Sequence, residues 1–134
     1  MAFADPGISR QIINSGVGPE APTVTLAAAC KRGDVLGYNS GWVLADADGV
    51  VQGRLIALAD GAIGDVIPVS PRAVVGGYTG ATPGNPVYVS TTGGVVTQTI
   101  PTTATHATTV IGIALSATEV LFILNSRADS VVAS

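Results

Sequence analysis

Two glycine-led segments decide the fold of this chain: residues 33–41, GDVLGYNSG, and residues 84–94, GNPVYVSTTGG. In both, a glycine is followed by Asp or Asn, then by a short run that contains Val, and then by further glycine. Glycine adopts backbone angles that other residues avoid, and Asp and Asn favour turns. Each segment therefore predicts a turn that begins a strand, followed by a hairpin that contains glycine.

A second pair of segments repeats in the same order. Residues 56–69, IALADGAIGDVIPV, and residues 113–123, IALSATEVLFI, both open on Ile-Ala-Leu. The spacing within the second repeat is longer because residues 102–109, TTATHATT, are extra, which predicts a surface loop there. Two similar β units within one domain predict a pseudo-symmetric barrel or sandwich.

The chain as a whole fits an all-β fold. Short runs of Val, Ile, Leu and Thr alternate with Gly, Asp, Asn and Pro, and no window keeps apolar residues at helical spacing. Residues 1–22 carry prolines, glycines and one short apolar pair, Ile12 and Ile13, which predicts an extended arm that stays disordered or lies along a neighbouring chain. We therefore predict an extended N-terminal arm at 1–22, a compact β-barrel or sandwich of two similar glycine-initiated units at 23–125, and a polar C-terminal tail at 126–134.

Composition limits the possible partners. The chain of 134 residues fits one domain, and only 11% of its residues are charged, against roughly 25% in soluble domains. A surface so poor in charge predicts an oligomer or a docked subunit. The net charge of −3 with a single lysine, Lys31, argues against nucleic acid as a partner, because binding phosphates requires clustered Lys and Arg.

The sequence carries no segment typical of export or membrane insertion. Its start lacks the basic and apolar stretches of a secretory signal. Its apolar runs fall far short of the about 20 residues of a membrane-spanning helix. We therefore expect a soluble cytoplasmic product with no membrane partner.

The residues that chemistry requires are sparse. Catalysis needs a nucleophile, a base and an orienting group brought together, yet His106 lies in the Thr-rich insertion and is expected to be an exposed loop residue. Cys30 excludes an intrachain disulfide because it has no second cysteine, and we expect it to be a small buried residue. Asp46 and Asp48 resemble the start of a calcium loop but lack its later acidic ligand, so we expect a hairpin turn. We predict no enzyme, no catalytic, cofactor or metal site, and no small-molecule substrate.

The segment KRGDVLGY at residues 31–38 allows three interpretations. Arg-Gly-Asp is an adhesive triplet, and GDVL occurs in biotinyl and lipoyl carrier domains, but the only lysine precedes the glycine instead of lying on a hairpin tip. The repeat has Pro83 and Asn85 where Arg32 and Asp34 stand, so it does not preserve the charges. We therefore favour a turn that begins a strand. The residues predicted to make such turns are Gly33, Asp34, Gly64, Asp65, Gly84, Asn85, Gly93 and Gly94.

Residues 81–125 resemble the small β-rich decoration, or capsid cement, proteins of tailed bacteriophages. The parts that are similar are the Gly84-Asn85 turn, VYVSTTGG at 87–94, GIALS at 112–116 and EVLFIL at 119–124. The resemblance implies a structural virion protein, made in the bacterial host cytoplasm, that binds the outer capsid surface and braces the expanded head. It also implies the major capsid protein as partner, a homotrimer, and no cofactor.

Within the arm, the expected capsid-contact residues are Ile8, Arg10, Ile12 and Ile13. An extended arm can add its backbone to an exposed sheet edge, and repetition around a ring multiplies weak contacts. We expect that removing residues 1–22 leaves a folded barrel that no longer binds heads. Two alternatives stay open: a tail-tip or head-fibre adhesin that uses the loops at 75–83 and 102–109, and a β module encoded by a host.

Overall fold

The computed structural model describes residues 3–7, 10–14, 21–47, 51–100, 102 and 109–124. These residues form eleven β-strands and no helix, which confirms the all-β prediction. The same ranges therefore contain no candidate for a membrane-spanning helix. The strands are β1 (Gln11–Asn14), β2 (Thr23–Thr25), β3 (Val35–Tyr38), β4 (Trp42–Leu44), β5 (Leu55–Ala57), β6 (Val66–Ser70), β7 (Arg72–Gly76), β8 (Pro86–Val89), β9 (Val96–Thr97), β10 (Val110–Ala114) and β11 (Glu119–Ile123).

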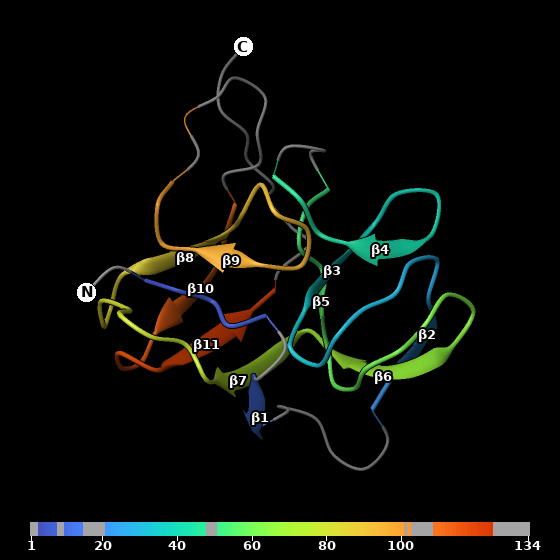
Figure 1. Ribbon diagram of the computed structural model, residues 1–134, viewed down its shortest axis with the longest axis horizontal. Coiled ribbons are helices and arrows are strands. Elements are labelled where there is room, and N and C mark those ends of the chain that lie inside the picture. Colours follow the sequence, from blue (N-terminus) through green and yellow to red (C-terminus); the bar gives the residue numbers. More distant parts are fainter. Residues whose placement is uncertain are drawn as a thin grey trace.

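The strands form two antiparallel sheets with matching strand orders. One sheet has the order β2-β6-β5-β3-β4, and the other has the order β1-β7-β11-β10-β8-β9. Apart from β1, each strand of one sheet has a counterpart at the same place in the other. We name strands β2 to β6 the first unit and strands β7 to β11 the second unit; they lie on the right and left of Figure 1. The predicted pair of similar β units is thereby confirmed.

The two units also share their register. Directly opposite residues on neighbouring strands lie on the same face of a sheet, so a chain of such pairs defines a row. In the first unit one row is Val35, Ile56 and Ser70, and in the second unit the equivalent row is Pro86, Ile113 and Leu121. The sequence repeat therefore fixes which residues stand side by side, as well as the strand order.

Four similar turns begin strands in the two units. The third residue of each is a glycine with positive φ: Gly33 (87°), Gly64 (92°), Gly84 (83°) and Gly94 (77°). In each, the N–H of the following residue donates to the carbonyl three residues earlier. A glycine with positive φ at the third position marks a type II turn. In two of the turns a carboxylate adds a bond: Asp34 accepts from the Lys31 N–H at 2.8 Å and Asp65 from the Ala62 N–H at 2.9 Å.

The core has two parts, and β3 and β5 separate them. The smaller cluster lies inside the first unit and consists of Leu26, Cys30, Leu36, Ala57, Ile67 and Val69. The larger cluster lies inside the second unit and is covered by Val35, Ile56, Ala45 and Ala47 of the first. Successive side chains of a strand point to opposite faces, so Val35 and Leu36 enter different clusters. Both are fully buried, at 0% exposure, and so the sheet of the first unit is covered on both faces at β3.

The described parts of the N-terminal arm pack against their own chain. β1 pairs with the outer edge of β7, and Ala4 and Thr79 exchange two backbone hydrogen bonds of 2.8 and 3.1 Å. Asp5 then accepts the N–H of Val96 in β9 at 3.0 Å. The expectation that the arm stays disordered or lies along a neighbour is therefore wrong for residues 3–7 and 10–14.

Candidate functional site

The second unit presents an apolar sheet face on its far side from the core. On β7 and β11, Val75 and Val120 point into the core while Val74 and Leu121 point away from it. We name the outward-pointing apolar residues of this sheet the outer face; they are Ile13, Val74, Pro86, Tyr88, Val110, Ile113, Leu121 and Ile123. Several are open to solvent, with exposures of 52% for Ile13, 51% for Val110, 46% for Ile123 and 39% for Ile113.

The sequences of β10 and β11 explain why this face is apolar. VIGIA and EVLFI carry apolar residues at inward and outward positions alike. An antiparallel strand with one solvated face normally alternates between apolar and polar residues, whereas continuous apolar runs are typical of strands covered on both faces. Contiguous exposed apolar patches on soluble proteins mark interaction sites. The outer face is therefore our candidate docking site.

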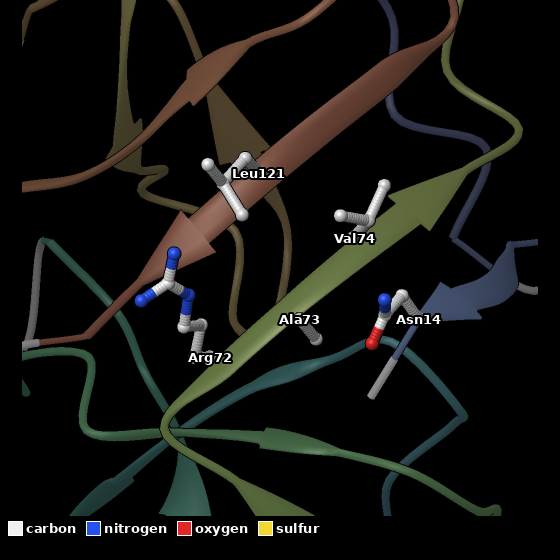
Figure 2. A pocket seen from close by; sticks show the side chains of 5 residues that line it. All are labelled: Asn14, Arg72, Ala73, Val74 and Leu121. Carbon is white, nitrogen blue, oxygen red and sulfur yellow. The ribbon is translucent and has the colours of Figure 1, made fainter. Parts of the chain in front are cut away.

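A shallow hollow lies on the same face between β1, β7 and β11. It has a volume of about 170 Å³ and is lined by Asn14, Arg72, Ala73, Val74 and Leu121. Figure 2 shows the side chains of Val74 and Leu121 on the same side of the two strands, with Arg72 and Asn14 at the margins. Sites for small molecules usually occupy about 300–1,000 Å³. The hollow is better suited to receive one side chain of a protein partner.

A buried ion cluster joins the arm to the first unit. Arg10 is 1% exposed and lies between Asp5, whose Oδ1 is 2.9 Å from its Nε, and Asp34, whose Oδ1 accepts from its Nη2 at 2.6 Å. The expectation that Arg10 contacts a capsid is therefore wrong, because its guanidinium is enclosed by the protein itself. We refer to Asp5, Arg10 and Asp34 as the ion cluster.

Burial and charge set the protonation behaviour of this cluster. Burial raises the pKa of Asp34, while the Lys31 N–H and the Arg10 guanidinium act to lower it. Burial acts to lower the pKa of Arg10, but Asp5 and Asp34 outweigh it and hold that pKa above its ordinary value. Arg10 therefore keeps its charge. Because Asp34 is only 6% exposed, the Arg-Gly-Asp triplet is not displayed as an adhesive loop would require.

Two of the turn glycines form walls of the ion cluster. A Cβ added to Gly33 would lie 3.0 Å from Cδ of Arg10, and one added to Gly94 would lie 2.9 Å from Cγ of Asp34. The equivalent additions at Gly64 and Gly84 would meet nothing within 4 Å. Sequence analysis selected these glycines for their turns and missed that two of them also give space to a buried ion pair.

The other predicted contact residues lie in different settings. Ile12 is half-buried and packs against the larger core cluster, opposite Val75, whereas Ile13 is exposed on the outer face. Ile8 lies outside the described residues. Asn85 donates its N–H to Thr82, which closes the turn before β8, and Gly93 lies beside Gly94 in the turn before β9.

The residues examined for catalysis show little reactivity where they are described. Cys30 is buried, its thiol lies 3.7 Å from the Ala59 carbonyl, and burial raises its pKa to about 11. A thiol with so high a pKa is a poor nucleophile at neutral pH. Among the described residues, no group of three His, Cys, Asp or Glu side chains is placed to hold a metal ion. His106 and Asp48 lie outside the described ranges.

The loop at 75–83, one of the two proposed for an adhesin, is anchored in the core. Tyr78 is 1% exposed and stacks on Phe3, with ring centroids 5.6 Å apart. Ala81 is also buried. Of the other loop, 102–109, only the two end residues are described. Comparison of the chain with protein-family models, with curated proteins and with solved structures found no match.

Proposed function

We propose that this protein is a structural virion protein that binds the outer surface of a tailed-phage capsid and stabilises the expanded head. The observation that carries the proposal is the outer face, an apolar sheet surface on a scaffold in which only 11% of residues are charged. The resemblance of residues 81–125 to capsid cement proteins names the class of partner. The partner is the major capsid protein, and no cofactor takes part.

A protein that braces a capsid needs a broad contact surface on a rigid scaffold, and it does not need a catalytic site. The second unit shares its core with Val35 and Ile56 of the first, and the arm adds β1 and the ion cluster across the two. A body braced in this way transmits load between neighbouring capsid subunits without deforming, since packed interiors have low compressibility. Self-association as a homotrimer multiplies the contacts of one molecule through avidity.

The arm enters this proposal in a different role from the one the sequence predicts. Removing residues 1–22 removes Arg10 and Asp5 of the ion cluster, the pairing of β1 with β7, and Phe3, which stacks on Tyr78 of the core. The truncated chain therefore loses the contacts that complete its second unit. The truncated chain is expected to be unfolded or aggregated, so its failure to bind heads would say nothing about the arm as a contact.

The test is the number of molecules on a particle. Quantitative mass spectrometry of purified particles gives the ratio of this protein to the major capsid protein, and we expect a ratio near equality. Purified expanded heads that lack the protein should bind the added full-length chain and withstand heating or low-salt shock better than undecorated heads. A few molecules per particle, or none, would contradict the proposal.

The adhesin alternative makes a different prediction for the same measurement. A tail-tip or head-fibre protein is present in a handful of molecules at one position of the particle. Tyr78 and Ala81 anchor the 75–83 loop in the core, while Gly77, Thr79, Thr82 and Pro83 are exposed, so this loop keeps a surface that an adhesin could use. A low ratio together with binding of the purified chain to host cells would support the adhesin instead.

A further inference from the structure

The first unit exposes two aromatic rings at the tip of the hairpin formed by β3 and β4. Tyr38 and Trp42 stand directly opposite each other, with ring centroids 5.3 Å apart and ring planes at 79°. Tyr38 is 63% exposed and Trp42 is half-buried, so the rings form a corner that is open to solvent. We refer to these two residues as the aromatic pair. The other aromatic residues of the chain are buried or pack against the larger core cluster: Phe3, Tyr78, Tyr88 and Phe122.

The rest of the first unit holds the aromatic pair in place. Trp42 packs against the smaller core cluster, and its carbonyl accepts from the Ala27 N–H at 2.8 Å. The turn between the two rings also lies close to Ala27, since a Cβ added to Gly41 would lie 2.6 Å from Cβ of Ala27. The rings are therefore positioned before any ligand arrives, which lowers the entropic cost of binding.

Uncharged polar residues connect the two rings. Asn39 and Ser40 are both exposed, and the Asn39 N–H donates to the Gly41 carbonyl at 2.9 Å. Ser40 has φ of 57°, and among the described residues it is the one residue other than glycine with positive φ. Residues held in such sparsely populated conformations cluster at functional sites. The hairpin tip thus combines an exposed ring with an amide and a hydroxyl in a strained turn.

The chemistry of the tip favours an uncharged ligand with an apolar face and a polar rim. Residues 38–42, YNSGW, contain no charged side chain, so they offer no counterion to a phosphate, sulfate or carboxylate. A quaternary ammonium ligand is usually enclosed by a cage of aromatic rings, whereas one ring of this pair is half-buried. A pyranose ring with equatorial hydroxyls directs C–H groups to its two faces and hydroxyls to its rim. Such a ring can stack on Tyr38 while its hydroxyls bond to polar groups of the turn.

We infer that the aromatic pair binds a neutral carbohydrate built from pyranose rings with equatorial hydroxyls. This binding function is separate from the proposed binding to a capsid and does not depend on it. The hairpin belongs to the first unit and the outer face to the second, on the right and left of Figure 1, so one molecule can use both surfaces. One stacked ring binds weakly, but many copies of the protein on one particle multiply that binding through avidity.

The experiment uses Trp42 as its own reporter, because it is the single tryptophan of the chain. The full-length protein is titrated with cellotetraose and with chitotetraose, and at least one should change the tryptophan fluorescence in a saturable way at millimolar concentration. A hyaluronan tetrasaccharide, which has equatorial hydroxyls but carries carboxylates, should bind more weakly. Tyr38→Ala and the bulkier Tyr38→Leu should raise the dissociation constant roughly tenfold or more, whereas Tyr38→Phe keeps the ring and should retain binding. Ile63→Ala is the matched control, because Ile63 is 73% exposed in another turn of the same unit. Circular dichroism and thermal unfolding establish that each variant is folded.

Several results would overturn the inference. No saturable change with either neutral tetrasaccharide, binding that Tyr38→Ala and Tyr38→Leu leave intact, or equally tight binding of the hyaluronan tetrasaccharide would each do so. If neither neutral sugar binds and Tyr38→Ala abolishes binding to expanded heads, the aromatic pair contacts the capsid, and the proposed function survives without the inference. If a neutral sugar binds through Tyr38 but the protein does not bind heads, the inference survives and the proposed function fails.

Discussion

The first and second units have the same strand order and register, yet they are completed in different ways. The first unit closes on itself, because Leu26 forms a bridge with Trp42 and the Ala27 N–H donates to the Trp42 carbonyl at 2.8 Å. In the second unit the arm joins the segment after β7 to β9 through Ala4 and Asp5. The repeat thus gives both units the same strand pairing. The closing contacts differ, because the first unit is closed by its own residues and the second unit is closed by the arm.

The largest expected effect comes from removing the cation that joins the arm to the first unit. Arg10→Met leaves the buried Asp34 without its counterion, and breaking a buried pair in this way costs about 3–5 kcal/mol. Urea unfolding followed by circular dichroism measures the loss. Arg32→Met is the control, because Arg32 is exposed and its replacement should cost less than about 1 kcal/mol. Equal losses for the two variants would contradict the assigned role of the ion cluster.

A smaller effect separates the two equivalent turn glycines. Gly33 and Gly84 have φ of 87° and 83°, so an alanine at either position adopts a left-handed conformation that costs about 1–2 kcal/mol. Gly33→Ala should cost about 1 kcal/mol more, because its Cβ would lie 3.0 Å from Cδ of Arg10, whereas Gly84 has open space. Thermal unfolding of the two variants compares the units directly. The difference should shrink when Arg10→Ala is also present, because that change removes the Cδ and Nη1 contacts and leaves only the 3.1 Å contact with Cβ of residue 10.

The pH dependence of Arg10→Met sharpens the same comparison. Burial raises the native pKa of Asp34, and loss of the guanidinium removes a cause that lowers it, so the pKa rises further in the variant. A carboxyl with a raised native pKa favours folding at low pH and loses that contribution as the pH rises through the native pKa. The deficit in unfolding free energy of the variant relative to the unaltered protein should therefore narrow as the pH falls through the native pKa of Asp34 in the variant, by up to ~1.4 kcal/mol per pH unit. Urea titrations at several pH values measure it; a constant deficit would exclude Asp34 as the source.

The smallest effect concerns the hydroxyl of Tyr78, which lies inside the second unit. It is buried and has no hydrogen-bond partner among the described residues, and burial raises its pKa above the ordinary value. Tyr78→Phe removes an unsatisfied polar atom and keeps the ring that stacks on Phe3. We expect stability to be unchanged or to rise by about 1 kcal/mol. A loss above that amount in thermal unfolding would show that the hydroxyl has a partner.

The local features of the fold followed from the sequence, and the long-range ones did not. The turns at Gly33 and Gly84 could be predicted from the sequence, because positive φ is a local requirement that few residues other than glycine meet. The sequence also predicted two similar units, because residues 33–41 resemble residues 84–94 and residues 56–69 resemble residues 113–123. Arg10 and Asp34 gave no such signal, because a charged residue that will be buried has the same local pattern as one on the surface.

The candidate docking site could also be predicted only in part from the sequence. The apolar character of β10 and β11 is visible in the sequence, but only the sheet register reveals which of their residues point away from the core. Ile13 was selected as a contact residue for its apolar character alone, and it lies on the outer face. Ile12, its neighbour with the same character, lies against the core. Two adjacent identical residues cannot be distinguished until the pairing partner of their strand is known.

The placement of the arm also sets the order in which the molecule can be completed during synthesis. The arm leaves the ribosome before the strands that it contacts, because Asp5 bonds to a residue 91 positions later and β1 pairs with β7. Arg10 and Asp34 are separated by only 24 positions and can meet early, within the first unit. The arm can be seated fully only after β9 has been made. Chains that stop before β9 therefore lack a closed second unit, so full seating of the arm requires that synthesis has passed β9.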